Sequence, residues 1–365
     1  MSLLVLDPDI AAAQKFAQQL TDLGFDTLVS TEPGAASGLC SQGHIELLVC
    51  CDDKLLQQVV VPAGVGYVYA TQQPPEVGHL LQVLDEGVQD IWPLPMPDEK
   101  LRNKVHAIID RMQHWLNEVS RELRDARSEL ERDQRAGQYI QMGMLPPNPM
   151  GIGHYRLQHK VEPSLILSGD FVDYFQITDR YFACYVADVS GHGASSAFVT
   201  VLLKNFSRRL RREYRPSMLT QPGEVLAWIN AELIDQQIDK HVAMFFAVVD
   251  MRDNCLHYAN AAHFPPAALV QQNQITSLEQ KGKPLGLFPA LNFESRTVDF
   301  PEDSRLVVFS DGVLDLLKGS TLEDKEQQLS ASIVQQQTLS ELWSVLDTTK
   351  LGADDVSCLL VNHEH

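Results

Sequence analysis

Residues 98–145 constrain the fold most, because this stretch carries a helical pattern and no strand pattern. Apolar or small residues recur along it in steps of three and four, with one additional step of four, at positions 105, 108, 112, 115, 119, 123, 126 and 130. A seam of this kind is typical of a coiled coil with a stutter. A single long surface helix packed on a domain is the alternative. The prolines of MLPPNPMG end the pattern, so the segment separates residues 1–97 from residues 146–365.

Residues 1–97 alternate short apolar runs with helical patterns. Strands are predicted at 3–7, 26–30, 45–51 and 65–70, and helices at 10–24 and 76–87. Short apolar strands that alternate with helices indicate a parallel sheet covered on both faces. We therefore expect an α/β doubly wound domain in this part of the chain.

Residues 146–365 are rich in strand patterns, which helical blocks interrupt at 194–214, at 224–237 and within 326–347. Mostly antiparallel strands with helices in blocks are typical of an α+β sandwich. The chain is thus expected to be multidomain, with a doubly wound domain, a helical coiled-coil linker and a sandwich flanked by helices.

Charge and cysteine content exclude several functional classes. The net charge is −19, from 29 basic and 48 acidic side chains, and this argues against nonspecific binding of nucleic acid, which requires Lys and Arg. The acidic balance is compatible with divalent cations, although solubility alone would also explain it. The six cysteines include no CxxC pair, so we expect reduced core thiols rather than disulfides or a zinc site. The chain begins with a strand rather than a signal peptide and has no apolar run of membrane-spanning length. We expect a cytoplasmic protein.

Four aspartate-containing turns each end an apolar run in the C-terminal part: SGDFVD (168–173), ADVSGHG (187–193), FSDGVLD (309–315) and GADDVS (352–357). The pattern places carboxylates on sharp turns at the rim of a sheet. Ligand sets made only of oxygen favour hard cations such as Mg²⁺ and Mn²⁺. A single aspartate in a turn is also explained by helix capping or an Asx-turn, but four such turns together indicate a metal site.

At these residues the sequence resembles the bacterial SpoIIE-like branch of the metal-dependent PPM protein phosphatases, over about 150–362. SGDFVD, ADVSGHGASSA, LHYANAAHFPPAAL, GKPLGL, FSDGVLD and ADDVS match successive motifs of that family in order. The resemblance implies a PPM-type β-sandwich flanked by helices and a centre with two Mn²⁺ or Mg²⁺ ions.

The family's metal ligands carry over by position. Asp188 would bridge the two ions, and the backbone carbonyl of Val189 would help to bind one of them. Asp311 and Asp354 would hold the other ion. Two cations of this kind clamp phosphoryl oxygens and lower the pKa of a water that attacks phosphorus.

Other motif residues are assigned supporting roles by the same resemblance. Asp170 would orient the metal-activated water, and Asp173 and Asp355 would support the site. His192 would either protonate the leaving group or serve only as a loop residue. Apart from the resemblance, the basic residues of 207–215 stand out in an acidic chain. This segment would either bind an acidic partner or the substrate phosphate, or form a solvated helix face.

The N-terminal part resembles a response-regulator receiver domain with a degenerate site. Asp7 and Asp9 stand where a receiver has its acidic pair, but Cys51 occupies the phosphoacceptor position. Leu94 stands where a receiver has its lysine. We expect a pseudo-receiver used for binding or dimerisation; phosphorylation of Asp52 through a one-residue shift is the alternative.

The leading hypothesis is therefore a protein serine/threonine phosphatase that uses metal-activated water and is regulated through the receiver-like domain and the linker. The family resemblance implies a phosphorylated anti-sigma-factor antagonist as the substrate, and the seam implies a homodimer through 98–145. The rival is a non-catalytic adaptor that uses the phosphatase fold to bind proteins. Neither hypothesis includes nucleic acid or a membrane as a partner.

Overall fold

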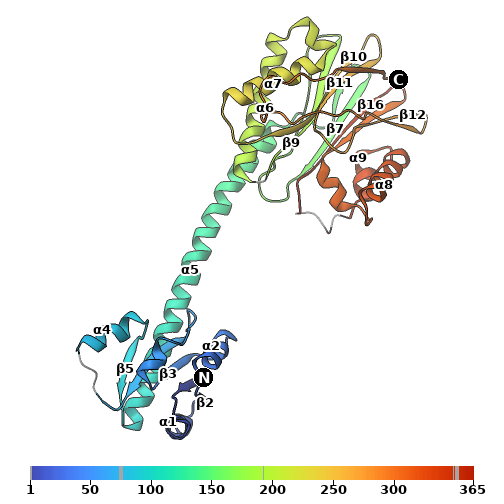
Figure 1. Cartoon of the computed structure of the whole chain (residues 1–365). Coiled ribbons are helices and arrows are strands. Elements are labelled where there is room, and N and C mark those ends of the chain that lie inside the picture. Colours follow the sequence, from blue (N-terminus) through green and yellow to red (C-terminus); the bar gives the residue numbers. More distant parts are fainter. Residues whose placement is uncertain (1, 74–76, 192, 348, 350–352) are drawn as a thin grey trace. The chain divides into compact units, whose positions relative to one another are not determined.

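The computed structural model describes residues 2–73, 77–191, 193–347, 349 and 353–365. The chain divides into two units, residues 1–128 and residues 129–365, which Figure 1 shows and which we describe separately. None of the described helices is long and apolar enough to cross a membrane.

The first unit contains a parallel sheet with the strand order β2-β1-β3-β4-β5. Its strands are β1 (Ser2–Leu6), β2 (Asp26–Ser30), β3 (Leu47–Cys50), β4 (Gly66–Thr71) and β5 (Asp90–Pro93). Its helices before the linker are α1 (Ile10–Asp22), α2 (Pro33–Ser41), α3 (Asp53–Leu56) and α4 (Val77–Asp85). This is a doubly wound order in which the direction of winding reverses between β1 and β3, so the predicted α/β architecture is confirmed.

Local sequence explains where these elements begin. Asp9 caps α1, because its side chain accepts hydrogen bonds from the backbone N–H groups of Ala11 and Ala12. Helix α2 was not predicted, since its sequence PGAASGLCS contains few strong helix formers. Its buried residues Ala36 and Cys40 pack in the core on one side of the sheet, so tertiary packing compensates for weak propensity.

Helix α5 (Asp98–Met144) is one continuous helix that extends from the first unit into the second. The beginning of the predicted seam packs against its own sheet, since Leu101, Val105 and Ile108 are buried in the core of the first unit. Farther along, Leu123 is 67% exposed and Leu130 is 59% exposed. The interpretation of a surface helix packed on a domain therefore holds for the first turns, and a coiled-coil partner for the rest stays a prediction.

The second unit contains two sheets packed face to face, with the orders β14-β11-β10-β9-β8 and β13-β12-β15-β16-β7-β6. The first sheet consists of β8 (Phe171–Gln176), β9 (Tyr181–Val189), β10 (Val242–Asp250), β11 (Cys255–Ala261) and β14 (Arg296–Asp299). The second consists of β6 (Met150–Ile152), β7 (Tyr155–Glu162), β12 (Ala268–Gln271), β13 (Gln274–Ser277), β15 (Ser304–Phe309) and β16 (Val356–His363). Pairing within both sheets is antiparallel, as the sequence predicted.

Helices cover the outer face of each sheet (Figure 1). They are α6 (Ala194–Glu213), α7 (Pro222–Asp235), α8 (Leu322–Gln335) and α9 (Leu339–Ser344), with 3-10 helices at η1 (Pro216–Leu219) and η2 (Asp311–Leu316). One apolar core fills the space between the sheets and includes Phe182, Phe245 and Leu359. Separate cores lie under α6 and α7 and under α8 and α9, so the unit is an α–β–β–α sandwich.

The single helix predicted within 326–347 is wrong in number, since α8 and α9 occupy this region. Thr321 begins the first and Thr338 begins the second, each through a capping box with the acidic residue three positions later. The N-cap at Thr338 therefore divides the segment predicted as one helix into two helices.

Candidate metal centre

The motif aspartates lie at one edge where the two sheets of the second unit meet. Asp188 is the second-to-last residue of β9. Asp170 directly precedes β8, the strand that pairs with β9 in antiparallel orientation. Asp311 follows β15, and Asp354 precedes β16, the next strand of the other sheet. Strand order therefore brings together carboxylates that are up to 184 positions apart in the chain (170 to 354).

Asp188 has the most perturbed environment among the predicted ligands. Burial, followed by the negative charges of Asp311, Asp354 and Asp355, raises the pKa of its carboxyl to about 7. Burial and the charge of Asp354 also raise the pKa of Asp311. These carboxylates thus repel one another, and a bound cation would stabilise their ionised forms.

The donor set fits Mn²⁺ or Mg²⁺, because it consists of carboxylate oxygens with a backbone carbonyl beside them. Val189, whose carbonyl is the predicted additional ligand, is the last residue of β9. Among the described residues, the three carboxylates of Asp188, Asp311 and Asp354 do not all lie within 4.8 Å of one another. Ligands shared between two ions need not meet that closely, since each ion contacts a different subset.

Asp170 is 3% exposed and links the two sheets. Its Oδ2 accepts a hydrogen bond from Ser310 Oγ at 2.6 Å, and Ser310 Oγ in turn accepts one from the Ser357 backbone N–H at 2.8 Å. Burial, followed by the charge of Asp188, raises the pKa of Asp170 well above its usual range. Ser310, which the sequence reasoning did not single out, thus positions Asp170 beside the metal-ligand candidates.

Asp355 holds a loop rather than facing open solvent. Its Oδ1 accepts hydrogen bonds from the Ser164 backbone N–H at 2.6 Å and from Ser164 Oγ at 2.8 Å. Its Oδ2 accepts one from the Gly169 backbone N–H at 2.6 Å. A Cβ atom at Gly169 would come within 2.9 Å of the Val189 carbonyl oxygen. Only glycine therefore fits between the Asp355 carboxylate and the end of β9.

Asp173 makes its contacts on the α6 side of the sheet. Its Oδ1 accepts a hydrogen bond from Lys204 Nζ at 2.8 Å, and both side chains are largely buried. The pair joins β8 to α6. A direct role of Asp173 at the metal centre stays a prediction, whereas this ion pair is a structural role that the sequence did not reveal.

The end of α5 contacts the same loop. Gln141 is 4% exposed, and its Nε2 donates to the Ser168 carbonyl at 2.7 Å and to Thr200 Oγ1 at 3.0 Å. The Ser168 backbone N–H donates to Gln141 Oε1 at 3.1 Å. One glutamine therefore joins α5, α6 and the residue two positions before Asp170, a connection that no local sequence pattern indicates.

His192 lies outside the described residues. The basic segment 207–215 is partly used within the fold, since Arg209 forms an ion pair with Glu232 at 2.8 Å and lies over the ring of Trp228. Arg208, Arg211 and Arg212 are exposed on α6, so the alternatives of a partner site and a solvated face both stay open.

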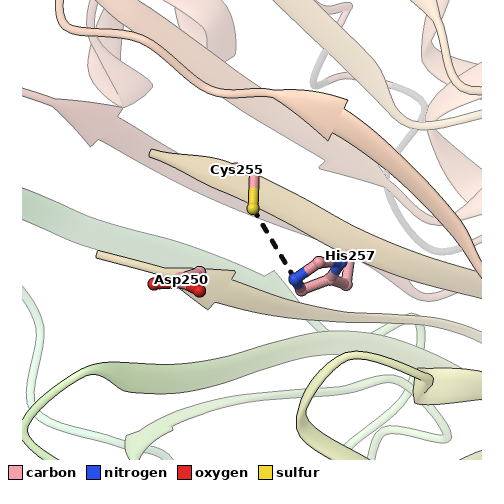
Figure 2. A group of neighbouring side chains, drawn as sticks. All are labelled: Asp250, Cys255 and His257. Atoms are coloured by element: carbon pink, nitrogen blue, oxygen red, sulfur yellow. Dashed lines mark hydrogen bonds between the residues drawn. The ribbon is translucent and has the colours of Figure 1, made fainter. Parts of the chain in front are cut away.

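A different cluster, in the described part of the chain, has potential ligand atoms within 4.8 Å of one another: Asp250, Cys255 and His257 (Figure 2). Although burial opposes it, hydrogen bonds from Arg180 lower the pKa of Asp250 to about 2, and Arg180 Nε lies 2.7 Å from its carboxylate. Cys255 Sγ lies 3.6 Å from His257 Nε2. Because Arg180 already neutralises the carboxylate, we interpret this cluster as the closure of the β10–β11 hairpin.

The receiver-like residues of the first unit serve mainly as caps. Asp7 Oδ1 accepts a hydrogen bond from the Asp9 backbone N–H at 2.9 Å, and Asp9 caps α1. Asp52 caps α3 by accepting from the backbone N–H groups of Lys54 and Leu55. Cys51 follows β3, and burial raises its pKa, so the thiol is poorly suited to nucleophilic chemistry.

Comparison with known proteins adds to this geometry. A family model described as Stage II sporulation protein E (SpoIIE) matches residues 178–364, slightly more than half of the chain. The chain belongs to the SpoIIE family. The match includes Asp188, Asp311 and Asp354.

Two curated relatives resemble parts of this SpoIIE-family chain. The phosphoserine phosphatase RsbP of Bacillus subtilis is 31% identical over 159 residues, which are 41% of this chain and 37% of that protein. Protein IcfG of Synechocystis is 25% identical over 220 residues, covering 54% of this chain and 34% of that protein. The chain thus spans about a third of the length of the curated relatives it matches.

Solved structures share the fold of the SpoIIE-family unit. The SiaA-PP2C domain of Pseudomonas aeruginosa aligns with a TM-score of 0.51 and 15% identity, over 65% of this chain and 98% of that chain. The RsbU and RsbW domains of Rv1364c from Mycobacterium tuberculosis align with a TM-score of 0.50 and 21% identity, over 60% of this chain and 62% of that chain. The predicted PPM-type sandwich is confirmed for the C-terminal unit.

Proposed function

We propose that this protein is a metal-dependent phosphatase that hydrolyses phosphoserine or phosphothreonine on a partner protein. The observation that carries the proposal is the convergence of Asp188, Asp311 and Asp354 at one edge of a PP2C-type sandwich. Their shared electrostatic environment suits divalent cations, and a relative with 31% identity is a phosphoserine phosphatase.

Asp188, Asp311, Asp354 and the carbonyl of Val189 would hold two Mn²⁺ or Mg²⁺ ions. When bound, such ions supply a water nucleophile at neutral pH and neutralise charge on the phosphoryl group. Asp170 lies beside Asp188 and is oriented by Ser310 at 2.6 Å. We assign to Asp170 the orientation of the attacking water, because the hydrogen bond from Ser310 fixes the direction of its buried carboxyl group beside Asp188.

The partner and the regulation are also proposals. RsbP and the SpoIIE family support a phosphorylated anti-sigma-factor antagonist as the substrate. The exposed apolar residues of α5, Leu123 and Leu130 among them, support a homodimer through 98–145. The sheet order of the first unit supports a receiver-like domain that regulates by binding, since Asp9 and Asp52 are occupied as helix caps.

The proposal is tested with the full-length protein and a phosphoserine peptide. We expect release of inorganic phosphate with Mn²⁺, none with EDTA, and none from the Asp311→Asn variant with Mn²⁺. If the wild-type protein with Mn²⁺ releases no phosphate from peptides or from phosphorylated candidate partners, the result would support the rival hypothesis of a non-catalytic adaptor. Release of phosphate that is insensitive to EDTA would contradict the metal-dependent mechanism.

A further inference from the structure

Lys240 places a positive charge on the turn that follows Asp188. Its Nζ donates a hydrogen bond to the Ser190 backbone carbonyl at 2.9 Å, and Ser190 is two residues after Asp188. Two residues of extended chain span at most roughly 7 Å, so the ammonium group contacts a turn whose Ser190 Cα lies within that distance of the Asp188 Cα. Within the described parts of the chain, no carboxylate lies within 4.0 Å of Nζ.

Neighbouring backbone bonds fix the position of Lys240. The Ser190 N–H donates to the His241 carbonyl at 2.9 Å, and the His241 N–H donates to Ser190 Oγ at 3.1 Å. One step farther along, Val242 pairs with Val189 in the sheet. Lys240 thus stands opposite Gly191, where an added Cβ would come within 2.9 Å of Nζ. The side chain of Lys240 is therefore held against the turn that follows Asp188.

The Ser190 carbonyl does not depend on a lysine for its hydrogen bond. Ser196 Oγ, from the first turn of α6, donates to the same oxygen at 3.1 Å. A neutral donor is thus already present, whereas Lys240 adds a charge and two further N–H donors. The positive charge of Lys240 at the Ser190 carbonyl would serve to bind an anion beside this turn.

We propose that Lys240 forms a subsite that binds the phosphoryl group of a phosphate monoester next to the metal centre. This inference rests on the proposed function. The phosphoryl group of a phosphoserine carries about two negative charges, and it would approach an edge that contains Asp188, Asp311 and Asp354. Lysine binds phosphate as a compact point charge, so Lys240 would hold a non-bridging oxygen while its contact with Ser190 keeps it in place.

The test measures binding of inorganic phosphate, the reaction product, to Mn²⁺-loaded full-length protein by calorimetry. We expect Lys240→Gln to weaken phosphate binding on the order of tenfold or more, the range of a lost charged hydrogen bond. Lys240→Arg keeps the charge and should stay within about threefold of wild type, a difference of under 1 kcal/mol by the same conversion.

Ser196→Ala is the matched control, because it removes the other donor to the Ser190 carbonyl and leaves the charge. It should bind phosphate as wild type does, and all three variants should keep wild-type Mn²⁺ affinity in the absence of phosphate. Unchanged phosphate affinity in Lys240→Gln, or equal losses in Lys240→Gln and Ser196→Ala, would overturn the subsite.

A wild-type protein that binds Mn²⁺ and hydrolyses a phosphopeptide, with Lys240→Gln unchanged in phosphate affinity, refutes the subsite and leaves the proposed function intact. A wild-type protein without Mn²⁺-dependent hydrolysis refutes the proposed function instead, and with it the subsite. Loss of Mn²⁺ affinity in Lys240→Gln would show that the lysine only braces the turn, which also overturns the subsite.

Discussion

Asp188 shows how one side chain can be costly to the fold and useful for binding. Burial and the three neighbouring carboxylates oppose its ionisation, so the charged form is unfavourable until a cation neutralises it. The same residue is held in a regular strand pair, opposite Ala243 in β10. The backbone therefore keeps the carboxylate in place even though its environment disfavours the charge.

This environment predicts a pH-dependent stability of the metal-free protein. The folded-state pKa of Asp188 is raised from 3.8 to about 7, so its contribution to stability is present below about pH 4 and is lost as the pH rises towards 7. Relative to Asp188→Asn, the wild type should lose on the order of 2 kcal/mol of unfolding free energy over this range, after allowing for screening by solvent.

Urea unfolding in EDTA at several pH values measures this difference. Saturating Mn²⁺ should restore the wild type and leave Asp188→Asn nearly unaffected, because a cation that binds only the folded state stabilises it. Parallel pH profiles of the wild type and the variant in EDTA would contradict the account of the site.

At the scale of elements, Gln141 is the clearest connection between a helix and the site. Its amide satisfies both backbone groups of Ser168 as well as Thr200. Gln141→Ala would leave these buried groups unsatisfied, so we expect a loss of about 2–3 kcal/mol in unfolding free energy of the C-terminal unit. Gln113→Ala, at an exposed position of the same helix, should change stability by less than about 0.5 kcal/mol.

Chemical unfolding followed by tryptophan fluorescence compares these two variants. If Gln141 also positions the loop before Asp170, its alanine variant should lose phosphatase activity under conditions where it is still folded. Equal stabilities of the two variants would show that the contacts of Gln141 contribute little.

The exposed seam of α5 predicts a dimer. Leu123 and Leu130 are 67% and 59% exposed, and placing a charge at such positions in a coiled coil removes the apolar contact that joins the helices. The double variant Leu123→Glu and Leu130→Glu should sediment as a monomer under conditions where the wild type is a dimer.

Ser128→Glu, which lies outside the seam, is the control and should leave the sedimentation of the wild type unchanged. A wild-type protein that is monomeric at all accessible concentrations would refute the coiled coil. A dimer that persists in the double variant would place the interface elsewhere.

At the scale of the whole molecule, local patterns predicted the fold class of each unit but not every element. Alternating and continuous apolar runs predicted β1 to β4 and most strands of the second unit, but not the short strands β5, β6 and β13. The aspartate turns marked positions where strands of the second unit begin or end. Helix α2 was missed because packing of Ala36 and Cys40 overrides weak propensity. The division between α8 and α9 was missed because it depends on the cap at Thr338.

The site was only partly predictable for a different reason. The candidate ligands stand in short motifs, whereas the residues that orient them are distant in sequence. Asp355 contacts Ser164 across 191 positions and Ser310 contacts Asp170 across 140. Gln141 and Lys240 likewise act through backbone groups, which leave no pattern in the sequence. Such partners become visible only when the sheets are assembled.

The most direct test of the central claim is a calorimetric titration of Mn²⁺ into the full-length wild type, Asp188→Asn and Cys255→Ser. The last variant alters the other cluster with converging ligand atoms, Asp250, Cys255 and His257. We predict that the wild type and Cys255→Ser bind Mn²⁺ with similar affinity and that Asp188→Asn loses most of this binding. Wild-type affinity in Asp188→Asn, or a loss confined to Cys255→Ser, would contradict a metal centre at the edge where the two sheets meet.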